Sequence, residues 1–227
     1  MSDDNDCARL TVASARLGKP LSFCLLLIAF FVGIDVLFFA QGASFKREGG
    51  GLETVSVVLY GVALIVFFRL APARDRLRLF HIPALMALFA MRELDLDKAF
   101  TEAGILSLKL YGGDAALSTK LIAGAVALSV VYVVLRTLRL GIPAMWSALK
   151  AGESWPWYAA LAGGLVVATK LVDGLGRKLL DFGIVVSDDV SVLAATAEEI
   201  GEAFIPVCAI LAMIAFWRGA AHEHHAS

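Results

Sequence analysis

The chain has 227 residues, of which 59% are apolar and 18% are charged, and its mean hydropathy is +0.78. Soluble domains contain about 45–50% apolar residues, so this composition is typical of a polytopic membrane protein. The formal net charge is −1, and no basic run is interleaved with aromatic residues, which argues against nucleic acid as a partner. The partner that the sequence predicts is the lipid bilayer.

Six apolar runs are long enough to cross a hydrocarbon core about 30 Å thick, which takes about 20 helical residues. We therefore expect an all-α bundle of six transmembrane helices in one domain, 21–217, between an N-terminal segment, 1–20, and a tail, 218–227. The first twenty residues do not open with the basic patch of a secretory signal peptide, so the first run is expected to remain as a span. The expected helices are 21–42, 52–71, 77–97, 118–139, 156–178 and 190–217.

The orientation follows from the basic residues near the helix ends, because Lys and Arg predominate in cytoplasmic loops. With six spans, more Lys and Arg fall on the side of the two termini than on the other side, so both termini are expected to be cytoplasmic. The basic residues of the terminal side are Arg9, Arg16, Lys19, Arg69, Arg74, Arg76, Arg78, Arg136, Arg139, Lys150 and Arg218. Those of the other side are Lys46, Arg47, Lys98, Lys109, Lys120, Arg177 and Lys178.

Charged residues of the expected helices gather at one depth, in or beside the halves that face away from the cytoplasm. A charge at the centre of a membrane helix costs about 2.5–3.5 kcal/mol on insertion scales, so it persists where partners, water or function retain it. We therefore expect these residues to line a ligand-binding site, and we call them the outer charged layer. Its members are Glu53, Arg92, Glu93, Asp95, Asp97, Lys120, Lys170, Asp173, Glu198, Glu199 and Glu202.

The last expected helix carries the densest group of acids in the outer charged layer. Glu198 and Glu202 are four residues apart and Glu199 and Glu202 are three apart, so they share one helix face. Pro206 follows Glu202 by four residues, where its ring clashes with the Glu202 carbonyl. We expect a kink at this point that turns Glu202 inward.

Acidic and basic residues alternate along other expected helices. Lys170 and Asp173 are three residues apart, and Asp173 and Arg177 are four apart, so all three are expected on one face of the fifth helix. Glu93 and Asp97 are likewise four apart on the third helix. This alternation is typical of an ion-pair network.

The composition of the outer charged layer favours one class of cofactor, a divalent cation with oxygen ligands such as Ca²⁺, Mg²⁺ or Mn²⁺. The layer contains no histidine, which argues against zinc held by imidazoles. His81 lies at the other end of its helix, where we expect a packing or interfacial role. The candidate metal ligands are Glu198, Glu199, Glu202 and Glu93.

Three functions from different classes fit these residues. A transporter or ion-binding protein would use the carboxylates to bind a cation, protons or a small solute, with the bases balancing charge. An enzyme acting on a lipid or lipid-linked substrate would use paired carboxylates as general acid and base, with or without a metal. A non-catalytic accessory protein would hold a structural ion-pair network. The acids of the last helix favour the first, either as a monomer or as a homo-oligomer.

One phrase resembles a known group of proteins. Arg92-Glu93-Leu94-Asp95, followed by Lys98 and Phe100-Thr101, resembles a pattern in uncharacterised bacterial multi-pass inner-membrane proteins. The resemblance implies a bacterial inner membrane, with the outer charged layer on the periplasmic side, and it implies no activity.

Small residues and cysteines are expected to serve packing. Gly163-Gly164 and the pair Gly174 and Gly176 are small enough to permit close approach of helices. Cys7, Cys24 and Cys208 show no paired spacing, so reduced packing cysteines are expected.

Overall fold

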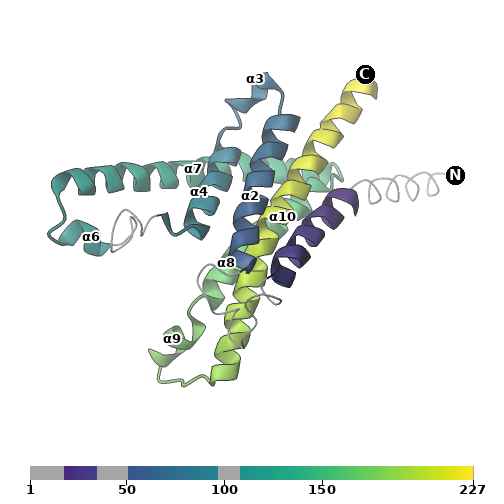
Figure 1. Ribbon diagram of the computed structural model, residues 1–227. Coiled ribbons are helices and arrows are strands. Elements are labelled where there is room, and N and C mark those ends of the chain that lie inside the picture. The colour runs from purple at the N-terminus through teal and green to yellow at the C-terminus, as the bar shows by residue number, and fades with distance from the viewer. Residues whose placement is uncertain (1–17, 35–50, 97–107, 227) are drawn as a thin grey trace. The chain divides into compact units, whose positions relative to one another are not determined.

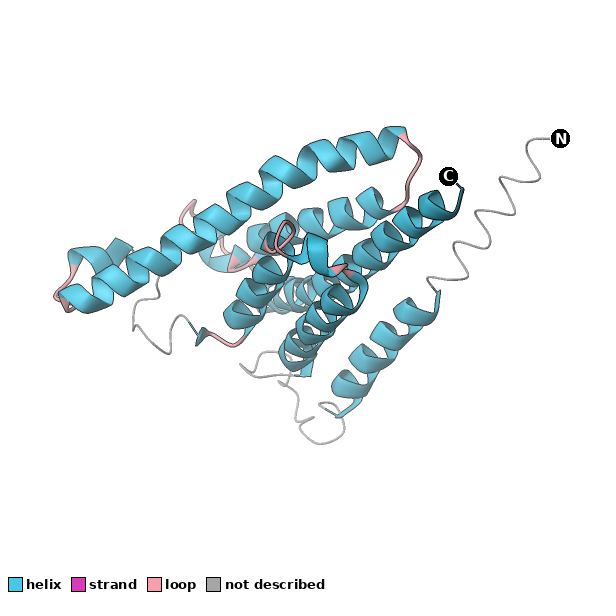
Figure 2. Cartoon of the chain, turned by 90° about the horizontal axis from the view of Figure 1, so that it is seen from above, coloured by secondary structure: helices cyan, strands magenta, loops and turns pink. Residues whose placement is uncertain are grey.

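The computed structural model describes residues 18–34, 51–96 and 108–226. These residues form helices joined by turns, with no strand among them, which confirms the predicted all-α class (Figures 1 and 2). The helices are Gly18–Ile34, α2 (Gly51–Leu70), α3 (Ala73–Arg76), α4 (His81–Glu93), α6 (Leu108–Gly112), α7 (Leu117–Lys150), α8 (Trp155–Val172), α9 (Leu175–Leu180) and α10 (Asp188–Ala226).

Three of the described helices are long and apolar enough to cross a membrane: α2, α7 and α10 up to Gly219. Helix Gly18–Ile34 is a shorter apolar helix, and the remainder of the expected first span lies outside the described residues. These helices indicate a membrane protein. The predicted spans 52–71 and 190–217 agree closely with α2 and with the apolar part of α10.

Two predicted spans differ from the observed helices at their ends. The expected helix 118–139 continues to Lys150, because Pro143 is accommodated inside α7 and the residues after it keep a helical conformation. The expected helix 77–97 is shorter, since α3 and a turn precede His81 and Asp95 takes a left-handed φ of 48° just after α4 ends.

The predicted fifth span, 156–178, is interrupted. α8 ends at Val172, Gly174 adopts a φ of 62°, and α9 begins at Leu175. Glycine has no Cβ and takes this left-handed conformation at no steric cost, so it ends the helix here. The prediction that Asp173 and Arg177 share one helix face is therefore wrong, because the break lies between them.

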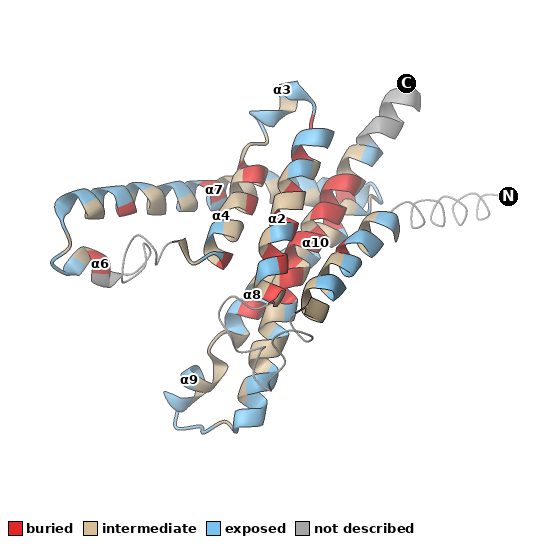
Figure 3. Ribbon diagram, in the orientation of Figure 1, coloured by how far each residue is buried: buried red, intermediate tan, exposed pale blue. Residues whose placement is uncertain are grey.

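Residue contacts divide the chain into two compact units, with the boundary inside α2. The first unit comprises residues 1–59 and 153–227, and the second comprises residues 60–152. In the first unit, α8 packs along α10. Half of the most apolar stretch of α10 is buried, centred on residues such as Ile205, Val207 and Ile210 (Figure 3). The Trp155 ring meets Phe216 edge to face at 5.4 Å between ring centres.

The second unit is held together by α4 and α7 together with the second half of α2. The Tyr60 ring of α2 stacks on Phe89 of α4 with ring centres 5.8 Å apart. Only 11% of the most apolar stretch of α7 is buried, so most of this helix presents apolar side chains to the surroundings (Figure 3). In a membrane, acyl chains can cover such an apolar face, since only polar groups need hydrogen-bond partners there.

Candidate functional site

The carboxylates of α10 lie just before its buried stretch. Glu198, Glu199 and Glu202 are all half-buried, and each already makes a polar or electrostatic contact. α10 runs through Pro206 without interruption, so the helix remains one element on both sides of the proline. The inward turn of Glu202 by a kink stays a prediction.

α8 approaches this group of carboxylates at one small residue. A Cβ placed on Gly201 would lie 2.6 Å from the Cγ2 atom of Thr169, and both residues are buried. The Thr169 hydroxyl donates to the Val166 carbonyl in its own helix at 3.3 Å. Thr169 thus bonds to its own helix through the hydroxyl and contacts α10 with its methyl group, so that only glycine fits opposite.

Charged residues lie next to this contact in the sequence of both helices. Gly201 follows Glu198 by three residues and precedes Glu202 by one, while Lys170 directly follows Thr169. The charged end of α8 and the carboxylates of α10 therefore flank the same helix contact in the first unit.

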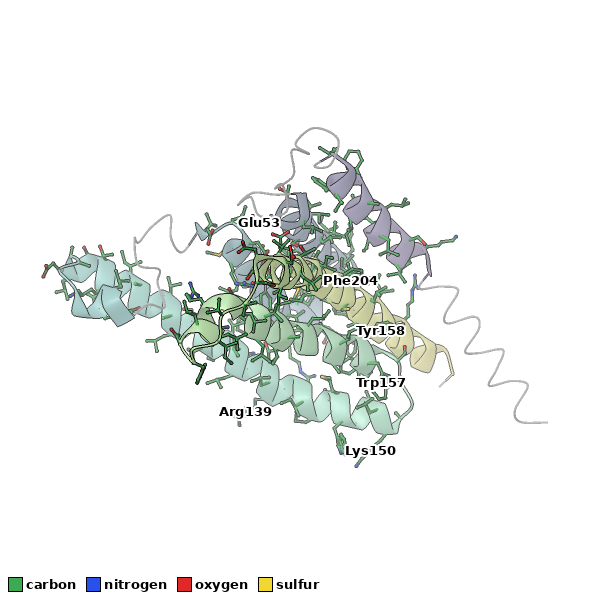
Figure 4. The ribbon with its side chains drawn as sticks, turned by 90° about the horizontal axis from the view of Figure 1, so that it is seen from below. Glu53, Arg139, Lys150, Trp157, Tyr158 and Phe204 are labelled. Atoms are coloured by element: carbon green, nitrogen blue, oxygen red, sulfur yellow. The ribbon has the colours of Figure 1, made fainter. Side chains whose placement is uncertain are left out.

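The predicted pair on α8 is confirmed. Lys170 Nζ lies 2.7 Å from Asp173 Oδ2, and both side chains are almost half exposed. Lys178 of α9 donates to the Lys170 carbonyl at 2.9 Å, which ties α9 back to the end of α8. Glu53 also belongs to the first unit, in the first turn of α2, and is labelled in Figure 4.

The remaining described members of the outer charged layer belong to the second unit. The Glu93 side chain is only 4% exposed, and its Oε1 lies 3.5 Å from Arg92 Nη1. Asp95 follows in a tight turn, where its N–H donates to the Arg92 carbonyl at 3.0 Å. Lys120 donates to the Gly113 carbonyl at 2.7 Å, so its ammonium secures the turn before α7. Asp97 lies outside the described residues.

The metal prediction gains no structural support. Among residues 18–34, 51–96 and 108–226 there is no group of three or more His, Cys, Asp or Glu side chains arranged to hold a metal ion. A divalent cation at the α10 carboxylates stays a prediction.

Sequence reasoning missed the residue that brings the two charged helices together. We expected close approach at Gly163 and Gly164, yet within the described structure a Cβ at either one would have no neighbour within 4 Å. Gly201 follows Ala197 by four residues on α10, and this pair of small residues on one helix face is the signal that could have found it. Cys24 and Cys208 are buried free thiols, as expected, and Cys7 lies outside the described residues.

Comparison with known proteins adds no relative: no family model, curated protein or solved structure matches this chain.

Proposed function

We propose that this chain is a six-span inner-membrane protein with both termini in the cytoplasm. The three long apolar helices would supply half of the spans. The shorter apolar helix Gly18–Ile34, together with α4 and α8, would supply the rest. The excess of Lys and Arg on the side of the termini supports this orientation. The outer charged layer then faces the periplasm.

The orientation can be tested in a variant that lacks Cys7, Cys24 and Cys208. Ser154, before α8, is replaced by cysteine in one protein, and Ser187, before α10, in another; both residues are exposed. A membrane-impermeant maleimide should label Ser187→Cys in intact cells with opened outer membranes, and Ser154→Cys only after lysis. The reverse pattern would contradict the proposed orientation.

We further propose that the α10 carboxylates, with the charged end of α8, bind a cation, protons or a small solute from the periplasmic side. The observation that carries this proposal is the contact of Thr169 with Gly201, because Gly201 lies between Glu198 and Glu202 in α10 and Thr169 directly precedes Lys170 in α8. Half-buried carboxylates that have a cationic neighbour can exchange that neighbour for an incoming cation or proton.

The test is the apparent melting temperature of the purified protein in a series of MgCl₂, CaCl₂ and MnCl₂ concentrations and pH values. A ligand at one hundred times its Kd stabilises the folded state by about 2.7 kcal/mol. We expect an added cation or a change of pH to raise the melting temperature of the wild type. The control variant Asp189→Asn, which changes an exposed acid in the first turn of the same helix, should show the same rise. Glu202→Gln should lose the effect.

One observation favours a second candidate function, a structural ion-pair network in an accessory protein. Every described acid of the outer charged layer already makes a contact, and Lys170 is paired with Asp173. A network of this kind would give no ligand-dependent shift, and Glu202→Gln would lower the melting temperature at every condition by the same amount. The same experiment therefore separates the two candidates.

A further inference from the structure

A basic patch lies in the second unit around the start of α4, whereas Glu93 lies at the end of that helix. We define it as Arg74 of α3, Arg78 in the turn that follows α3, His81 at the start of α4, and Arg136 and Arg139 of α7. The four arginines have one acidic neighbour in the segment from Arg69 to His81, Asp75, which lies 3.6 Å from Arg74. The patch therefore carries a clear excess of positive charge.

Arg136 joins the two sides of this patch. Its Nη2 donates to the Arg78 carbonyl at 3.0 Å, although the two residues are 58 apart in sequence. Its guanidinium carbon lies 5.0 Å from the centre of the Phe80 ring, and that ring stacks on Tyr132 of α7 at 6.3 Å. The hydrogen bond, the cation–π contact and the ring stacking hold α7 against the turn before α4, so Arg136 has a defined position in the patch.

One buried polar atom in the patch lacks a partner. The Nε of Arg136 has no hydrogen-bond partner within the described parts of the chain. His81 is 3% exposed. A buried unpartnered N–H is costly, and such groups in native structures commonly mark a missing water or ion. The acceptor that suits a guanidinium best is a phosphate or carboxylate oxygen.

Exposed apolar side chains lie beside the patch on α7. Leu135, Leu138 and Leu140 are exposed on either side of Arg136 and Arg139, and Arg139 extends away from the helix (Figure 4). An inorganic phosphate would leave these leucines without a partner, whereas the acyl chains of a phospholipid would cover them. Basic sites at the cytoplasmic ends of transmembrane helices suit anionic headgroups for this reason.

We propose that the basic patch binds the phosphate of an anionic phospholipid in the cytoplasmic leaflet. Arg78, Arg136 and Arg139 supply the charge, His81 supplies a buried polar atom, and the α7 leucines lie along the acyl chains. The assignment to the cytoplasmic leaflet rests on the proposed orientation, whereas the phosphate chemistry does not.

The test is native mass spectrometry of the full-length protein in micelles that contain equal amounts of phosphatidylglycerol and phosphatidylcholine. We expect preferential retention of phosphatidylglycerol, with its ratio to phosphatidylcholine falling about fivefold in Arg136→Gln and in Arg139→Gln, since each basic residue near an anionic surface contributes about 1 kcal/mol. Lys120→Gln, at the other end of α7, should keep the wild-type ratio.

Arg139→Gln keeps the test decisive if Arg136→Gln fails to fold, because Arg139 is exposed. Equal retention of the two lipids by the wild type would overturn the proposal, as would an unchanged ratio in folded Arg139→Gln. Displacement of the lipid by millimolar inorganic phosphate would show a free-phosphate site and would likewise overturn it. None of these outcomes depends on cation binding at the α10 carboxylates.

Discussion

The methyl carbon of Thr169 lies 2.6 Å from the point that a Cβ on Gly201 would occupy. Real side chains do not approach this closely, so one of the two helices must shift if Gly201 gains a methyl group. Threonine is β-branched and cannot turn its methyl away without giving up the hydrogen bond to Val166. The packing of α8 on α10 therefore depends on this one glycine.

We predict that Gly201→Ala lowers the free energy of unfolding by about 1–3 kcal/mol, the usual cost of overpacking a core. The measurement is denaturant unfolding in detergent. Gly164→Ala is the matched control, because a Cβ there has no neighbour within 4 Å of the described residues and alanine favours a helix by about 1 kcal/mol. Gly164→Ala should be neutral or stabilising.

Thr169→Ser tests the same contact from the other helix, since it removes the methyl group and keeps the hydroxyl. In the double variant Gly201→Ala, Thr169→Ser, most of the lost stability should return, and the two changes should be strongly non-additive. Strictly additive effects would show that Thr169 and Gly201 do not determine the separation of α8 and α10.

The break between α8 and α9 gives a second prediction. Gly174 has a φ of 62°, which costs a residue with a Cβ about 1–2 kcal/mol, and a Cβ there would also lie 3.0 Å from Arg177 Nη2. Gly174→Ala should therefore lower the free energy of unfolding by about that amount. Gly174→Asn should cost less, because asparagine tolerates the left-handed conformation. Equal stability of wild type and Gly174→Ala would mean that the break is not required.

Arg76 completes the end of α2. Its Nε donates to the Ala71 carbonyl at 3.1 Å and its Nη2 donates to the Phe68 carbonyl at 2.8 Å. Carbonyls at the end of a helix have no N–H donor from a following helical turn, so Arg76 supplies the missing donors. Arg76→Gln should therefore lower the free energy of unfolding by about 1 kcal/mol. Arg74→Gln is the control, because Arg74 is 76% exposed and its pairing with Asp75 contributes about 0–1 kcal/mol. Equal free energies of unfolding for Arg76→Gln and Arg74→Gln would show that Arg76 does not cap α2.

The buried carboxylate of Glu93 yields a fourth prediction. Loss of one partner from a buried ion pair costs about 3–5 kcal/mol, and we expect Arg92→Gln to cost at most the lower value because the Arg92 side chain is 38% exposed. Glu93→Gln in the same protein should restore part of the stability, since a neutral amide tolerates burial better than a carboxylate without its cation. A further loss of stability in the double variant would contradict this.

Helix positions were largely predictable where apolar runs were uninterrupted, and less so at their ends. α2 differs from the expected span by one residue at each end, because nothing within the run breaks the helix. α8 is shorter than expected because Gly174 has a positive φ, and hydropathy carries no information on backbone dihedral angles. α7 is longer because Pro143 is tolerated inside it.

The candidate site was predictable as a set of residues and not as an arrangement. The pairing of Lys170 with Asp173 followed from a spacing of three residues on one helix. The contact between Thr169 and Gly201 joins residues from two helices, and helical periodicity does not specify which faces of different helices meet. The partner of Lys120 was not predictable either, because its ammonium donates to the backbone carbonyl of Gly113 before α7 and spacing along a helix does not indicate such a bond.

Binding of a cation or proton at the α10 carboxylates, as proposed, would change their infrared spectrum. Infrared difference spectroscopy of the reconstituted protein detects this binding, because carboxylate stretching bands shift when a cation or proton binds. On perfusion with MgCl₂, CaCl₂ or MnCl₂, or on a pH step, we predict a carboxylate difference signal in wild type and in Asp189→Asn that is lost in Glu202→Gln. An identical signal in wild type and folded Glu202→Gln, or no signal in wild type, would show that Glu202 binds neither a cation nor a proton.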